Sequence, residues 1–250
     1  MEKYIIEGNR ITVFGKHKGS NSNKFNRVAK LASMFKEIDD KMNGFIKRGG
    51  VSAHSRCAIA IRLMLHTGIR IGNEGSAEGY MTKPHPYSKA EPKFVQTYGL
   101  TTLKREHTLI KRGIMYLNFV GKKQVENSFT ITNGLVAQVK MLLAKTDTDT
   151  LFDVTAYELT KFIKKYIGKQ FTPKDLRTLR ANIEAWKIYD TISTRPIAAT
   201  KKEFKNEVKE ILAHVSECLN NTPGVCRKSY IDDMLFQYHE VKRLNSNTKK

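Results

Sequence analysis

The sequence predicts an α+β fold that is mostly helical and contains one small antiparallel sheet. Over most of its 250 residues, apolar side chains recur at intervals of three and four, the spacing of one helix face. One region, 98–132, instead alternates apolar and polar residues, as strands do. Hydrophobic residues make up 40% of the chain, and no apolar run approaches the roughly 18 residues needed to cross a membrane. We therefore expect a soluble intracellular protein with a sizeable core.

The chain is strongly basic, with 44 Lys and Arg against 24 Asp and Glu, which gives a formal net charge of +20. This excess favours a polyanionic partner, and nucleic acid over a membrane surface because no amphipathic lipid anchor is evident. A generically basic protein would carry the same charge. Three cysteines, Cys57, Cys218 and Cys226, are too few for a disulfide framework, and no Cys/His grouping has zinc-ligand spacing. We expect them to be reduced and structural.

The first elements are a short basic arm and a helix. Residues 1–24 contain one strand-like piece, Arg10–Phe14, followed by a flexible loop at 15–23. An amphipathic helix is predicted over 25–48 and ends at Gly49. We expect one domain from residue 25 to residue 250.

The next helix is apolar almost all round over Cys57–Leu65, which places it at the centre of the core. It ends at Thr67 and Gly68, a typical C-terminal glycine stop. Arg70 follows directly, so a rigid scaffold positions its side chain. Two interpretations stay open for Arg70: a functional cation, or an ion pair with Glu74 four residues on.

The alternating region predicts a small antiparallel sheet. Its tightest turn, Gly121–Gln124, places Lys122 and Lys123 at the tip of a hairpin. Hairpin-tip lysines are usually solvated charges, but in a polyanion-binding protein they can equally form a finger that reaches into a groove. Helical spacing then returns in three stretches, which begin near Asn133, Thr155 and Phe204.

Another helix begins with Thr172 as its cap and proline as its first residue, and Asp175 completes a capping-box pattern. Its apolar stripe leaves Lys174 and Arg177 in the first turn on the other side. Basic residues oppose the helix dipole there, whereas the free amides favour an anion. We therefore expect a phosphate to bind at this turn.

A final capped turn, Thr222–Pro223, leads to Tyr230, which borders an apolar stripe and follows Arg227 and Lys228. From this stretch alone Tyr230 is an ordinary half-buried tyrosine or a residue that presents its hydroxyl to a bound anion. The upstream motifs favour the second interpretation.

Four stretches in fixed order resemble the type IB DNA topoisomerases, in particular the small viral and bacterial branch. None of the four would carry the resemblance alone, whereas their common order over residues 25–235 does. They are Thr67–Glu74, then Tyr98–Leu103 with Val120–Lys122, then Lys174–Thr178, and lastly Asn221–Pro223 with Arg227–Tyr230.

The resemblance implies a catalytic domain of the tyrosine recombinase and type IB topoisomerase fold. It identifies Tyr230 as the nucleophile, Arg70 and Arg177 as the arginine pair, Lys122 as the hairpin lysine and Lys174 as a further lysine of the site. Attack on a DNA phosphodiester would give a 3′-phosphotyrosine and a free 5′-hydroxyl strand, which swivels and then attacks back.

These residue types suit that chemistry. Two guanidiniums can neutralise charge on the nonbridging phosphate oxygens, and a lysine at a mobile tip can protonate the leaving 5′-oxygen. Asn221 stands where many members carry histidine, and bacterial members with asparagine there are known. Its amide can donate to a phosphate oxygen but cannot titrate. One phosphodiester replaces another, so neither ATP nor a metal is required in principle and we expect no cofactor.

The family normally has a separate, largely β N-terminal domain, and the 24 residues before Phe25 are too few for it. We expect a monomer that binds duplex DNA, with Lys123, Arg227 and Lys228 on the phosphates. Two other functions compete with this interpretation. A tyrosine recombinase would generally have histidine in place of Lys174, and a DNA-binding relative without activity would have lost part of the catalytic set.

Overall fold

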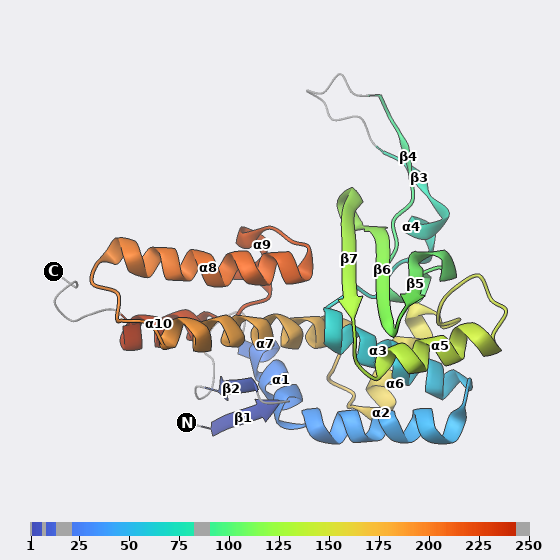
Figure 1. The fold of residues 1–250 in the computed structure, drawn as a ribbon, viewed down its shortest axis with the longest axis horizontal. Helices are drawn as coiled ribbons and strands as arrows, with labels where there is room; N and C mark the ends of the chain where they lie inside the picture. The colour runs from blue at the N-terminus through green and yellow to red at the C-terminus, as the bar shows by residue number, and fades with distance from the viewer. Residues whose placement is uncertain (1, 7–8, 14–21, 83–90, 244–250) are drawn as a thin grey trace. The chain divides into compact units, whose positions relative to one another are not determined.

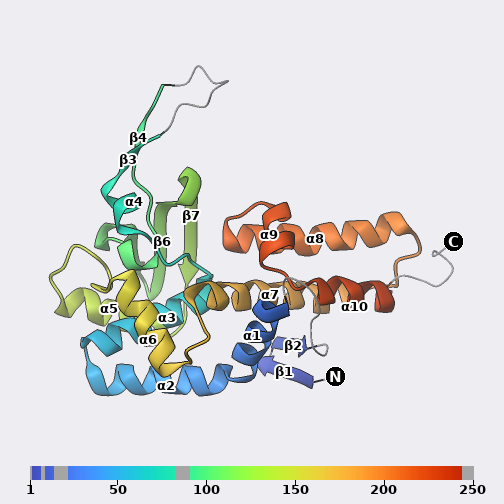
Figure 2. The ribbon, with the colours of Figure 1, turned by 180° about the vertical axis from the view of Figure 1, so that it is seen from behind.

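The structure, a computed structural model, describes residues 2–6, 9–13, 22–82 and 91–243, with side chains from residue 23 onward (Figures 1 and 2). It is mostly helical with small antiparallel sheets, which confirms the predicted fold class. Among the described residues, no helix is long and apolar enough to cross a membrane. The chain divides into two compact units: one comprises Met1–Ile38, Leu65–Gly68 and Lys174–Lys250, and the other comprises Asp39–Met64 and Ile69–Pro173.

The first unit is built around the long helix α7. Its predicted apolar stripe is buried, and α8 runs beside α7 in both views (Figures 1 and 2). Helix α7 begins at Pro173, as predicted, because proline lacks the N–H that a first helical residue does not need. The elements of this unit are β1 (Glu2–Ile6), β2 (Asn9–Val13), α1 (Ser22–Ser33), α7 (Pro173–Ser193), α8 (Lys201–Leu219), α9 (Pro223–Ser229) and α10 (Asp233–Arg243).

The second unit holds the three-stranded sheet and the apolar part of α3. In the sheet, β6 lies between β5 and β7, and Met115 pairs with Ile131 while Leu117 pairs with Phe129. This register confirms the small antiparallel sheet that the alternation predicted. The elements are most of α2 (Phe35–Gly49) and α3 (Ala53–Thr67), then α4 (Glu74–Glu78), β3 (Tyr80–Met81), β4 (Phe94–Val95), β5 (Thr108–Lys111), β6 (Ile114–Gly121), β7 (Val125–Ile131), α5 (Leu135–Lys145) and α6 (Ala156–Tyr166).

Several elements differ from the sequence expectation. The helix predicted over 25–48 is two helices, α1 and α2, that break at Met34. The N-terminal arm contains a hairpin, β1 with β2, rather than a lone strand, and α1 begins inside the predicted loop at Ser22. Most of that loop, 14–21, lies outside the described residues. The boundary at residue 24 stays a prediction.

Candidate active site

The loop that carries Arg70 is fixed by backbone hydrogen bonds. Helix α3 ends at Thr67, and Gly68 follows with a φ of 68°, the left-handed conformation that the glycine stop predicted. The amide of Leu100 donates to the Arg70 carbonyl at 2.8 Å, and the amide of Thr101 donates to the Ile71 carbonyl at 2.7 Å. Two motifs that are 30 residues apart in sequence are thereby joined.

This contact requires glycine at position 99. A Cβ placed on Gly99 would lie 2.5 Å from the Gly72 nitrogen and 2.6 Å from its Cα, and backbone atoms cannot move aside cheaply. We predict that Gly99→Ala lowers the free energy of unfolding by about 2 kcal/mol, as overpacking does. Gly134→Ala is the matched control, since a Cβ there meets nothing within 4 Å. Urea unfolding checks both, and equal effects of the two variants would contradict the prediction.

The hairpin lysines lie where the sequence placed them. Lys122 and Lys123 form a 3-10 turn at Lys122–Gln124 between β6 and β7, and both side chains are exposed. Lys123 has a φ of 64° and Gln124 a φ of 59°, so the turn holds two non-glycine residues in the left-handed region. The tip is therefore tight and presents cationic side chains to solvent.

Tyr230 follows the capped helix α9. The Thr222 side chain accepts a hydrogen bond from the Val225 amide, as the capped-turn prediction requires. The Asn182 side chain of α7 donates to the Tyr230 carbonyl at 2.8 Å and accepts from the Asp232 amide at 3.0 Å. The tyrosine backbone is thus fastened to α7, and its side chain is 9% exposed.

Arg177 lies directly against this tyrosine. Its guanidinium carbon is 5.1 Å from the centre of the Tyr230 ring, a cation–π contact. One terminal nitrogen donates to the Gly68 carbonyl and the other donates to the Leu219 carbonyl at 2.7 Å. The expectation that Arg177 lies on an open face of the first turn is wrong, because these contacts leave it 4% exposed. Lys174, in the same turn, is exposed.

The remaining predicted residues of this unit surround the tyrosine segment. Asn221 lies in the turn after α8, and its backbone N–H donates to the Ser216 carbonyl at 2.9 Å. Arg227 and Lys228 are exposed on α9. Arg177, Tyr230, Lys174, Asn221, Arg227 and Lys228 belong to the first unit, whereas Arg70, Lys122 and Lys123 belong to the second.

Lys24 is a neighbour of the site that the sequence analysis missed. Its ammonium group donates to the Ser229 carbonyl, one residue before the tyrosine, at 3.2 Å. Burial, and then the charge of Lys174, lower the pKa of Lys24. Arg27 pairs with the buried Asp175 at 3.0 Å and so holds α1 against the start of α7. Lys24 lies inside the predicted N-terminal arm, and its positive charge is the only sequence signal that could have marked it as a site residue.

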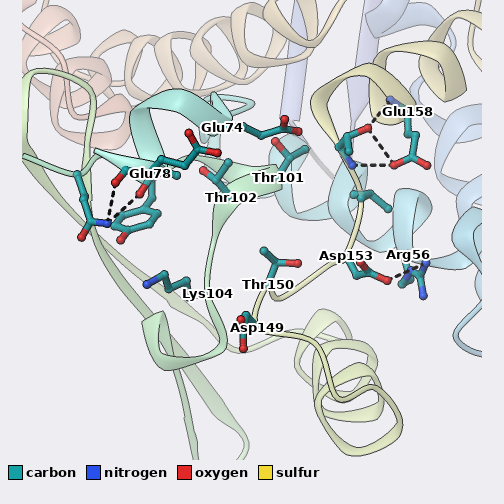
Figure 3. A pocket seen from close by; sticks show the side chains of 15 residues that line it. Arg56, Glu74, Glu78, Thr101, Thr102, Lys104, Asp149, Thr150, Asp153 and Glu158 are labelled. Carbon is teal, nitrogen blue, oxygen red and sulfur yellow. Dashed lines mark hydrogen bonds and ion pairs between the residues drawn. The ribbon is translucent and has the colours of Figure 1, made fainter. Parts of the chain in front are cut away.

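A pocket of about 800 Å³ in the second unit is lined by none of the predicted catalytic or DNA-binding residues (Figure 3). Carboxylates dominate its charged lining, and Arg56 is paired with Asp153 at 3.2 Å. A phosphate would be repelled there, so this pocket is not the candidate site. Its acidic residues are Glu74, Glu78, Asp149, Asp153 and Glu158.

Comparison with known proteins agrees with the resemblance. A family model described as the catalytic core of eukaryotic DNA topoisomerase I matches residues 15–250. DNA topoisomerase 1B of Acanthamoeba polyphaga mimivirus is 25% identical over 159 residues, which cover 58% of this chain and 47% of that protein. DNA topoisomerase 1 of rabbit fibroma virus is 23% identical over 158 residues, which cover 60% and 48%.

A vaccinia virus relative, DNA topoisomerase 1B of strain Copenhagen, is 26% identical over 235 residues, which cover 90% of this chain and 67% of that protein. The matched part spans about half the length of the mimivirus and rabbit fibroma virus relatives. The family-model match includes the stretches that carry the two arginines, the hairpin lysines and Tyr230.

Proposed function

We propose that this chain, which belongs to the family of the eukaryotic DNA topoisomerase I catalytic core, relaxes supercoiled duplex DNA by cleaving and rejoining one strand. The observation that carries the proposal is the contact of Arg177 with Tyr230, a cation against the expected nucleophile. The exposed lysines and arginine around this pair, and the net charge of +20, suit a DNA backbone.

In the proposed reaction the Tyr230 hydroxyl oxygen attacks phosphorus and loses its proton to solvent. The bond from phosphorus to the 5′-oxygen breaks, and Lys122 donates a proton to that oxygen. The products are a 3′-phosphotyrosyl bond and a free 5′-hydroxyl strand. Religation reverses each step, so no bond energy is consumed and no ATP is needed.

The other predicted catalytic residues stabilise negative charge. Arg70 and Arg177 stabilise the negative charge on the nonbridging oxygens in the transition state, which a planar two-pronged donor does better than an ammonium group. The Asn221 amide can donate to the same oxygens. Neighbouring guanidiniums also favour the phenolate form of a tyrosine.

The tyrosine is largely covered in this structure and is not presented to a phosphate. Tyr230 is 9% exposed, and both terminal nitrogens of Arg177 donate to backbone carbonyls. We propose that DNA binding displaces the tyrosine segment and the lysine hairpin into their reactive positions, as ligand-driven closure does in other enzymes.

Relaxation of a negatively supercoiled plasmid in EDTA without ATP tests the proposal. We expect relaxed topoisomers, and SDS added during the reaction should trap the protein on the 3′ side of a nick. A tyrosine recombinase that lacks its target sequence, or a DNA-binding relative without activity, would bind the plasmid and leave it supercoiled. Light scattering of the protein in solution tests the accompanying proposal that it acts as a monomer.

Lys123 offers a test of DNA contact that is separate from catalysis. If its ammonium group neutralises one phosphate, Lys123→Ala should reduce the slope of log K against log salt by about one unit. Lys123→Arg keeps the charge and is the matched control. Fluorescence anisotropy with a short duplex at several salt concentrations measures the slope, and an unchanged slope in Lys123→Ala would rule out the contact.

A further inference from the structure

Three potential metal ligands meet on the inner face of α7 and α8, outside the residues used above. His214 and Cys218 are four residues apart on α8 and therefore lie on one face of that helix. Glu184 comes from α7. Its Oε2 lies 3.0 Å from His214 Nε2 and 3.9 Å from Cys218 Sγ, and these last two atoms are 3.6 Å apart.

The three contacts form a triangle rather than a chain. In a nucleophile, base and carboxylate relay, the histidine uses one ring nitrogen for each partner. Here the same nitrogen, His214 Nε2, faces both Glu184 and Cys218. Three potential ligand atoms that converge in this way suit a common cation better than a proton relay, and His214 Nε2 releases its proton when the ion binds.

The triangle also has the dimensions of a zinc site. Bond lengths of about 2.3 Å to sulfur and 2.0–2.2 Å to nitrogen and oxygen put tetrahedral ligands roughly 3.4–3.6 Å apart. The measured separations of 3.0, 3.6 and 3.9 Å differ from this by a few tenths of an ångström. Rotamer adjustments of that size are small for side chains that are partly exposed, as His214 and Cys218 are.

We propose that Glu184, His214 and Cys218 bind a transition metal ion of the Zn²⁺ class, with a water molecule as the fourth ligand. A thiolate and an imidazole disfavour Mg²⁺ and Ca²⁺, which prefer oxygen ligands. Carboxylate, imidazole and thiolate are all ligands that zinc accepts, and three protein ligands leave one position for solvent.

The surroundings hold the carboxylate in place. Its other oxygen, Glu184 Oε1, accepts from Arg180 at 2.7 Å and from Lys187 at 2.9 Å, which leaves Oε2 directed at His214 and Cys218. The two cations repel a metal ion, whereas the carboxylate and thiolate together balance its charge.

A metal ion there would join α7 to α8 beside the candidate active site. Cys218 immediately precedes Leu219, whose carbonyl accepts from Arg177. The role we assign is structural, since the cleavage chemistry passes through none of these three residues. The inference goes beyond the proposed function and stands or falls independently of DNA relaxation.

Titration of the metal-stripped chain with Co²⁺ tests the site. We expect one equivalent to bind with the visible absorption of tetrahedral cobalt and a thiolate-to-cobalt charge-transfer band, both of which Zn²⁺ removes. Cys218→Ala should abolish the charge-transfer band, and both Cys218→Ala and His214→Ala should weaken binding at least 100-fold. That loss exceeds the 10–100-fold typical of groups that only orient ligands.

Cys57→Ala is the matched control, because Cys57 is a buried free thiol of α3 in the other unit. It should bind Co²⁺ as the wild type does. A second readout is thermal unfolding, in which Zn²⁺ should raise the midpoint of the wild type and of Cys57→Ala, but not that of Cys218→Ala.

Circular dichroism of each metal-free variant verifies its fold, and the milder His214→Gln replaces any variant that fails. Absence of one-equivalent binding by the wild type would overturn the site. An octahedral spectrum without charge transfer, or a charge-transfer band that Cys57→Ala removes and Cys218→Ala keeps, would do the same.

Discussion

Replacement of Tyr230 by phenylalanine should abolish plasmid relaxation while leaving duplex binding within about twofold of the wild type. The change removes one oxygen from a side chain that is 9% exposed, so the packing against Arg177 is retained. Loss of a covalent nucleophile costs on the order of 10⁴-fold or more in rate. The measurement is the initial rate of relaxation in EDTA, with SDS trapping of the adduct on end-labelled DNA.

Tyr157→Phe is the matched control, because Tyr157 lies on α6 with 72% of its surface exposed. It should relax DNA at the wild-type rate. If Tyr230→Phe still forms the covalent adduct, another residue is the nucleophile and the assignment of Tyr230 fails.

Arg177→Ala should lose both catalysis and stability. Removal of one preorganised donor to a transition-state charge costs about 10²–10³-fold in rate. The same guanidinium also joins the Gly68 and Leu219 carbonyls, and hydrogen bonds from a charged group contribute about 1.5–3 kcal/mol each. We therefore expect the free energy of unfolding to fall by about 3 kcal/mol. Single-turnover cleavage and urea unfolding measure the two losses separately.

Arg195→Ala provides the comparison for Arg177. Arg195 forms a two-pronged pair with Glu210 in which both side chains are exposed, so its loss should cost at most about 1 kcal/mol and no activity. Arg177→Lys separates the two roles further, because it keeps the charge but cannot reach both carbonyls as a fork. Full activity in Arg177→Ala would remove Arg177 from the proposed mechanism.

Structural elements whose signals lie in a few adjacent residues could be predicted from the sequence. The glycine stop at Gly68, the start of α7 at Pro173 and the cap at Thr222 each depend on a few adjacent residues, and the structure has all three. The lysine turn was predictable for the same reason, since alternation on both sides fixes where a hairpin must reverse.

The environment of Arg177 was not predictable in this way. Helical spacing places it beside Lys174, yet the carbonyls that cover it are 109 and 42 residues distant in sequence. The proposed metal ligands show the same difference between local signals and contacts of residues that are distant in sequence. The sequence alone predicts no zinc site, because His214 and Cys218 supply only two ligands four residues apart. The third, Glu184, is 30 residues from His214, and nothing local connects them.

The sequence by itself therefore determined the fold class, the family, the position of the lysine hairpin and three helix ends, because motif order and capping residues are features of the sequence. It did not reveal the break at Met34 in the helix predicted over 25–48. Only the tertiary structure decided that Arg177 is buried against Tyr230, that Lys24 reaches Ser229 and that three ligands converge between α7 and α8. Those contacts depend on how separate helices pack, and packing is set by the whole core rather than by any one segment.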